Sequence, residues 1–144
     1  ESKLSSQLNV DTIVDKAGSG GTNVKIGNTS TYVSDGGGAT QNTVQGIIKA
    51  WWTYDQASTL LEDSHNIASL TDNATGNHTG AFTNSMSATT YAVSGVCESN
   101  GIIQVHSDGA KVASSLRMQT GDGLGSSGVL DYDECSVMVS GDLA

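Results

Sequence analysis

Short runs of alternating apolar and polar residues make up most of the chain after residue 46. Residues 47–54 are apolar and aromatic with a period of two, and residues 101–106, 111–118 and 134–140 show a similar pattern. A period of two is typical of β-strands that bury one face. Gly, Asn, Asp and Ser separate these runs, and these residue types favour turns. The pattern predicts an all-β domain of about seven strands, a compact antiparallel β-sandwich or a related fold.

The central stretch of the chain has the pattern of a hairpin. Residues 66–70 form a short apolar run, and residues 79–83 and 89–96 resume an extended pattern. Between them, residues 72–77 tolerate a positive φ or hydrogen bond to their own backbone. We therefore expect a turn over residues 72–77 that joins two antiparallel strands.

Two adjacent tryptophans, Trp51 and Trp52, lie within residues 47–54. Neighbouring side chains of a strand point to opposite faces, so one ring faces the core and the other faces a neighbouring subunit or solvent. Leu, Ile, Val and Phe together make up only about 20% of the 144 residues, a low share for a chain that folds alone. Trp51 and Trp52 are therefore both candidates for a subunit interface in a closed cyclic oligomer, and we expect one of the two rings to meet the neighbouring subunit.

The chain divides into two regions of different composition. Residues 35–39, Asp-Gly-Gly-Gly-Ala, have the composition of a flexible linker between two rigid units. Apolar residues are sparse before this linker and gather into strand-length runs after it. We therefore predict an N-terminal attachment segment over residues 1–45 and a C-terminal β-domain over residues 46–144.

The attachment segment contains two strand-like stretches, residues 10–15 and 23–27. A short hairpin is marginal in water without a partner surface. A mobile tail, the alternative, would not need the apolar residues found here. We therefore expect Val10, Ile13 and Val24 to lie at an interface with identical subunits or with another protein.

Several short motifs after residue 46 are similar, in order and spacing, to the C-terminal domain of tailed-bacteriophage tail fibre proteins. The motifs are residues 49–51, 66–73, 75–77 and 82–83, Met86, and residues 91–93 and 137–143. Three positions depart from the pattern of this family. Trp52 stands where a small aliphatic residue is usual, Ala74 replaces a turn glycine, and His78 replaces an aromatic residue.

This resemblance implies a bacteriophage virion protein that is assembled in the host cytoplasm. We expect a homotrimeric tail fibre in which residues 1–45 attach to other virion proteins and loops of the β-domain bind a glycan or protein of the bacterial surface. Several copies on one particle convert weak contacts into durable adhesion. A capsid decoration or head-fibre protein is the alternative. The candidate host contacts are turn residues: Asn77, His78, Asp108, Gly123, Ser126 and Ser127.

The motifs of enzymes and cofactor-binding proteins are not found in this sequence. Residues 123–128 match Gly-x-Gly-x-x-Gly, but no strand–turn–helix unit surrounds them, so we expect a loop. The three His residues are not spaced as ligands of one metal site, and no nucleophile motif is present. A polysaccharide hydrolase would need paired carboxylates on a larger scaffold. We therefore expect no enzyme activity, no cofactor and no metal site.

The formal net charge of −9 disfavours contact with nucleic acid phosphates. No apolar run reaches the length of a membrane span, and residues 1–7 lack the apolar core of a signal peptide, so we expect no membrane insertion. Cys97 and Cys135 lie far apart in the sequence at strand-like positions. The sequence leaves open whether they are free thiols or form a disulfide between two strands.

Overall fold

The computed structural model describes residues 30–33, 38–106, 110–123 and 128–144. The chain divides into two units, Glu1–Val44 and Gln45–Ala144. In the first unit, β1 (Thr31–Val33) and β2 (Thr40–Asn42) form an antiparallel pair. The strands predicted for residues 10–15 and 23–27, and with them Val10, Ile13 and Val24, lie outside the described residues.

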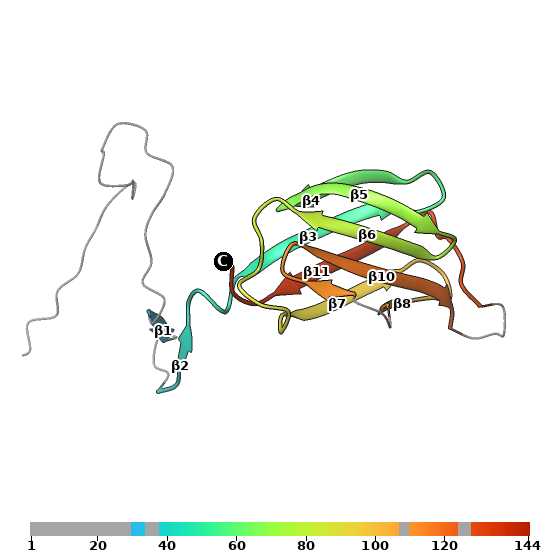
Figure 1. Ribbon diagram of the computed structural model, residues 1–144. Coiled ribbons are helices and arrows are strands. Elements are labelled where there is room, and N and C mark those ends of the chain that lie inside the picture. The colour runs from blue at the N-terminus through green and yellow to red at the C-terminus, as the bar shows by residue number, and fades with distance from the viewer. Residues whose placement is uncertain (1–29, 34–37, 107–109, 124–127) are drawn as a thin grey trace, which may run out of the picture. The chain divides into compact units, whose positions relative to one another are not determined.

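The second unit is built from two antiparallel sheets (Figure 1). One sheet has the strand order β4-β3-β11-β7, and the other has the order β5-β6-β10-β8, with the short β9 paired to β10. The strands are β3 (Ile48–Asp55), β4 (Leu60–His65), β5 (Ile67–Ala74), β6 (Asn77–Phe82), β7 (Ala92–Cys97), β8 (Gly101–Val105), β9 (Lys111–Val112), β10 (Ser115–Asp122) and β11 (Cys135–Ser140). The predicted all-β class is confirmed.

Side chains from both sheets form one apolar core, because alternate residues of each strand point inward. The buried members are Ala50, Trp52 and Tyr54 of β3, Cys135, Val137 and Val139 of β11, Leu116 and Met118 of β10, Phe82 of β6, and Met86 and Tyr91 from the β6–β7 connection. A Cβ atom added to Gly80 would lie 3.1 Å from the Trp52 ring. The glycine therefore leaves the space that this large ring fills.

The hairpin of β5 and β6 is confirmed, but its turn is shorter than predicted. β5 continues to Ala74 through two register shifts, and only Thr75 and Gly76 lie between the strands. Asn73 keeps the end of β5 in the ladder, because its Nδ2 donates to Thr79 Oγ1 at 2.9 Å across the pair. Residues with turn-forming side chains therefore extend the strand here.

Two other elements differ from the sequence predictions. The sequence does not predict β4, an acidic edge strand in which only Leu61 packs against the core. The single strand predicted over residues 111–118 is broken at Ala113 and Ser114, where β9 turns back to pair with β10. β10 then continues to Asp122 as the centre of its sheet.

Candidate functional site

Four connections lie together at one end of the second unit, which we call the loop end. They are residues 56–59 between β3 and β4, 75–76 between β5 and β6, 98–100 between β7 and β8, and the described part of 123–134 between β10 and β11. In Figure 1 the loop end is at the right, opposite the start of β3. Segments from both sheets thus contribute to one surface.

Hydrogen bonds join these connections to one another. Gln56 N donates to Tyr132 O at 2.9 Å, and Gly123 N donates to Asn100 O at 3.0 Å. Gly76 N donates to the Asp131 carboxylate at 2.6 Å. Each bond links two segments that are distant in the sequence, so the loop end is a connected surface in which each connection supports its neighbours.

A buried polar network centred on Gln56 lies beneath this surface. Gln56 Oε1 accepts hydrogen bonds from Thr120 Oγ1 at 2.9 Å and from Tyr132 N at 3.0 Å, and the Cys135 thiol lies 3.4 Å from the same oxygen. On its other side, Gln56 Nε2 lies 3.0 Å from His78 Nδ1. An amide nitrogen only donates, so His78 Nδ1 accepts and its proton is on Nε2. The network fixes the floor of the loop end.

Asn77 and His78 belong to β6 and not to a loop, and both are buried. The His78 ring packs against the Tyr54 ring with centroids 5.9 Å apart. Asn77 Oδ1 accepts from Arg117 Nε at 2.8 Å. The prediction that Asn77 and His78 are exposed host contacts is therefore wrong, because both side chains are held within the fold.

The remaining predicted host contacts divide between the loop end and the part of the chain that is not described. Gly123 is exposed at the loop end, directly after β10. Asp108, Ser126 and Ser127 lie outside the described residues. The sequence favours a solvated acidic turn over a cation site at Asp131, Asp133 and Glu134, and these residues are exposed at the loop end. Their clustering with acidic side chains of other connections follows from the topology and not from spacing in the sequence.

The loop end is acidic. Its strand ends and connections carry Asp55, Glu98, Asp122, Asp131, Asp133 and Glu134, and the same stretches contain no Lys or Arg. Ser58 donates through its hydroxyl to Asp55 at 2.6 Å and through its backbone N at 3.0 Å. These bonds lower the pKa of the Asp55 carboxyl, so its negative charge persists in mildly acidic solution. The surface therefore repels phosphate and carboxylate groups and attracts cationic ones.

The described residues contain no group of three or more His, Cys, Asp or Glu that is arranged to hold a metal ion. The acidic side chains of the loop end are thus spread over the surface and do not converge on one point.

The middle of the outer face of the β4-β3-β11-β7 sheet carries one carboxylate, Asp63. Two rows of outward side chains cross it: His65, Trp51, Met138 and Ser94 in one, and Asp63, Thr53, Ser136 and Val96 in the other. Met138 is 50% exposed and Val96 is 67% exposed, while Trp51, the cross-strand partner of Met138 on β3, is half-buried. We call this surface the apolar face.

The two tryptophans have different roles in the structure. Trp51 belongs to the apolar face, whereas Trp52 is 1% exposed in the core of its own chain. The opposite orientation of the two rings is confirmed, but the prediction that Trp52 lies at a subunit interface is wrong. Its ring is already covered by the other sheet, including Gly80.

The outer face of the second sheet is polar. Its cross-strand partners include Thr71 with Thr79, Thr79 with Arg117, and Gln104 with Gln119. Gln104 Nε2 donates to Gln119 Oε1 at 3.1 Å along this face. Side chains of this kind are well solvated, so the two sheets present different surfaces to their surroundings.

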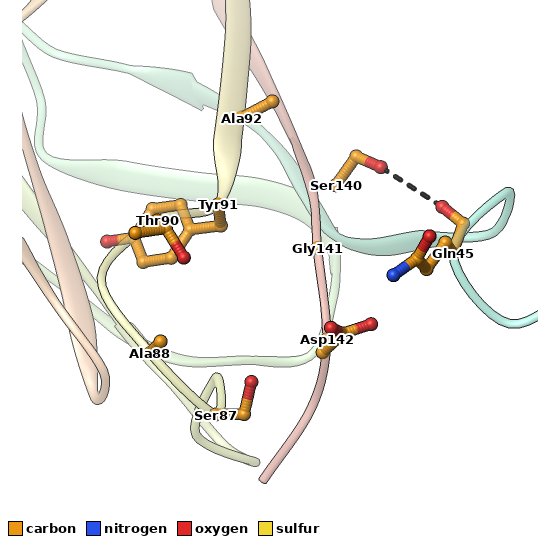
Figure 2. Close-up of a pocket in the computed structure, with 9 residues that line it drawn as sticks. All are labelled: Gln45, Ser87, Ala88, Thr90, Tyr91, Ala92, Ser140, Gly141 and Asp142. Carbon is orange, nitrogen blue, oxygen red and sulfur yellow. Dashed lines mark hydrogen bonds between the residues drawn. The ribbon is translucent and has the colours of Figure 1, made fainter. Parts of the chain in front are cut away.

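A pocket of about 360 Å³ lies at the end of the second unit opposite the loop end. Figure 2 shows its walls, formed by residues 87, 88 and 90–92 on one side and residues 140–142 on the other, with Gln45 beyond them. Ser140 Oγ donates to Gln45 O at 3.5 Å. The Tyr91 ring packs on Phe82 at 5.8 Å and its hydroxyl donates to Ser115 O, so this ring is not available as a stacking platform. The pocket thus offers hydroxyl, amide and carboxylate groups for a small polar ligand.

Within the described residues, no helix is long and apolar enough to cross a membrane.

Comparisons with known proteins give no relative from which a role could be transferred to these surfaces. No protein-family model matches the chain, and no curated protein and no solved structure matches it.

Proposed function

We propose that this chain is a structural protein of a bacteriophage virion, a tail fibre that binds the bacterial surface through the loop end of its β-domain. The observation that carries the proposal is that the two ends of the second unit differ. The unit begins at Gln45, beside Ser140 at the end of β11, whereas four connections gather at the opposite end. A fibre domain needs this arrangement, with attachment at one end and recognition at the other.

The motifs that resemble tail fibre proteins fall on connected elements of the fold. They form the start of β3, the β5–β6 hairpin, the start of β7 and the end of β11. β3 and β11 are paired neighbours at the centre of one sheet. The resemblance therefore covers the centre of one sheet and a hairpin of the other. This supports a domain type shared with tail fibre proteins, in which two sheets form a sandwich-like arrangement.

The apolar face supports assembly as a homotrimer. Copies of a chain with a net charge of −9 repel one another, so an interface between them needs a surface with few charges. The rows that contain Trp51, Met138 and Val96 include Asp63 as their one carboxylate, at the edge strand β4. We propose that this face lies toward the threefold axis and leaves the loop end free at the tip. Residues 1–45 then attach the trimer to other virion proteins.

The charge of the loop end limits the class of receptor. Phosphate-rich lipopolysaccharide cores and acidic capsules would be repelled by Asp131, Asp133 and Glu134. These carboxylates would not repel a neutral glycan, a glycan with free amino groups, or a basic patch of a surface protein. We propose a neutral or amino-bearing glycan as the receptor, bound without cleavage.

Binding to whole cells tests this function. Fluorescently labelled protein is incubated with a panel of bacterial strains and with neutral, amino-bearing and acidic polysaccharides. We expect saturable binding to a subset of strains and to a neutral or amino-bearing glycan. Asp133→Lys at the loop end should weaken this binding by at least about tenfold, the effect of about 1.4 kcal/mol.

Asp142→Lys is the matched control, because it makes the same charge change beside the pocket at the other end. If Asp142→Lys weakens binding and Asp133→Lys does not, the loop end is not the receptor site. If no strain binds and labelled antibody decorates phage capsids but not tails, the fibre role is wrong and the decoration role replaces it.

A further inference from the structure

Cys97 and Cys135 are direct partners across the antiparallel pair of β7 and β11. In the next pair, Glu98 N donates to Glu134 O at 2.9 Å. Hydrogen-bonded and non-hydrogen-bonded pairs alternate along an antiparallel ladder, so the two cysteines form a non-hydrogen-bonded pair. Cα atoms at such a position lie about 4.5 Å apart, with their side chains on the same face of the sheet. Disulfides span Cα separations of about 4.4–6.8 Å, so this pair can be bridged with little movement of the backbone. Both cysteines are free thiols in the structure.

The two thiols differ in their access to solvent. Cys135 is fully buried in the core, whereas Cys97 is half-buried. A reagent in solution therefore reaches the Cys97 sulfur first and reaches Cys135 only through it.

The two thiols also differ in acidity. The Cys135 thiol hydrogen bonds to Cys97, which lowers the pKa of Cys97, although burial and the Glu98 carboxylate act in the opposite direction. The same hydrogen bond and burial raise the pKa of Cys135. A thiolate is the nucleophile in exchange with disulfides, so Cys97 is the more reactive of the two.

We propose that Cys97 and Cys135 form a thiol–disulfide exchange site that closes a bond between β7 and β11. The Cys97 thiolate attacks one sulfur of a small external disulfide, breaks its S–S bond and releases one thiolate. The Cys135 thiol then loses its proton, its sulfur attacks the Cys97 sulfur, and the second external thiolate leaves. The protein loses two electrons and two protons, and the external disulfide is reduced to two thiols.

The product has a structural consequence that does not depend on the proposed function. β7 is an edge strand, whereas β11 lies at the centre of the sheet, so the bond fastens the edge of the sheet to its middle. Cross-linking also lowers the conformational entropy of the unfolded chain, because residues 97–135 become a closed loop. We expect the oxidised protein to melt on the order of 10 °C above the reduced protein.

The carboxylates around Cys97 determine which disulfides react. The Glu98 carboxylate acts on the Cys97 thiol, and Glu134 is the partner of Glu98 across the two strands. An anionic reagent such as glutathione disulfide is repelled there, while a cationic one is attracted. The site therefore selects cationic over neutral and neutral over anionic disulfides.

The test uses the reduced chain of 144 residues with cystamine, hydroxyethyl disulfide or glutathione disulfide. Samples are quenched with acid, alkylated and weighed intact, so that each protein species is counted. We expect the mass of two hydrogen atoms to be lost, with cystamine several-fold faster than glutathione disulfide at low salt and a smaller difference at high salt. A lasting mixed disulfide on the native chain would overturn the proposal, as would equal rates with all three reagents.

Single variants separate the two roles. Cys135→Ser should retain a mixed disulfide at Cys97, and Cys135→Ala is the second variant in case a hydroxyl in the core prevents folding. Cys97→Ser should not react while folded, as circular dichroism and melting confirm. If folded Cys97→Ser reacts as fast as the native chain, Cys135 is the accessible thiol and the proposed order of attack is wrong.

Discussion

At the scale of single residues, the loop end depends on Gly76. This glycine has a φ of +65°, and a Cβ atom added there would lie 2.6 Å from Thr120 O and 2.8 Å from Val129 Cβ. Gly128, in the neighbouring connection, has a φ of +79° but no atom within 4 Å of an added Cβ. Substitutions at both glycines therefore have the cost of a left-handed backbone in common, and only the substitution at Gly76 adds the cost of a steric clash.

We predict that Gly76→Ala lowers the free energy of unfolding by about 2–4 kcal/mol, through backbone strain and overpacking. Gly128→Ala should cost only about 1–2 kcal/mol, because it carries the strain alone. Urea denaturation followed by tryptophan fluorescence, to which Trp51 and the buried Trp52 both contribute, measures both values. Equal losses of unfolding free energy in the two variants would mean that the β5–β6 connection shifts away from the methyl group added at Gly76. The close contact of Gly76 with Thr120 of β10 would then contribute little to stability.

The sequence predicted some residue-scale features and could not predict others. Alternation established that Trp51 and Trp52 face opposite ways, but not which ring faces inward. The burial of His78 could have been found, because His78, Gly80 and Phe82 form one alternating row that ends in a buried aromatic residue. The role of Gln56 had no local signal, since its partners Thr120 and Tyr132 lie 64 and 76 residues away.

At the scale of elements, Asn66 is the corner at which the chain passes from one sheet to the other. It is the single residue between β4 and β5, and it has a φ of 60°. Its Nδ2 donates to Lys49 O at 3.1 Å and to Asn84 O at 3.0 Å, and its Oδ1 accepts from Asn84 N at 2.7 Å. Asn is one of the few residues that tolerates this φ, and its side chain joins the start of β3 to the β6–β7 connection.

We predict that Asn66→Gly, which keeps the φ and loses the side-chain bonds, lowers the free energy of unfolding by about 1–2 kcal/mol. Asn66→Ala should lose about 1 kcal/mol more, because alanine adds the strain of a left-handed backbone. Urea denaturation of both variants at one pH gives the difference directly. Should alanine be tolerated better than glycine, the corner would have to adopt another backbone conformation.

The missed elements share a physical cause. β4 reads as an acidic, weakly alternating stretch, because an edge strand needs only one side chain in the core, and here it is Leu61. The end of β5 reads as a turn because Asp72 and Asn73 favour turns locally, whereas cross-strand bonds to β6 hold them in the ladder. Strands with strong alternation, such as β3 and β11, were predicted to within about one residue at each end.

At the scale of the whole second unit, charge and apolar surface are separated. Acidic groups gather at the loop end, Lys49 and Lys111 lie in the half of the unit that contains the pocket, and the apolar face runs between the two ends. Composition predicted the excess of negative charge, but its concentration at one end follows from which strand ends the topology brings together. The same holds for the apolar face, whose members come from different strands in long-range register.

This separation leads to a prediction about assembly. If the apolar face lies at a threefold axis, a charge placed at its centre meets its own copies across the axis and breaks the trimer. Met138→Lys is the test, because Met138 is 50% exposed and its replacement leaves the core of the chain intact. Thr71→Lys, an exposed position of β5 in the other sheet, is the control. In sedimentation experiments at micromolar concentration, we expect the native chain and Thr71→Lys at three times the chain mass and Met138→Lys at the mass of one chain. A native chain that sediments as a monomer, or a Met138→Lys variant that remains trimeric, would remove the apolar face from the interface.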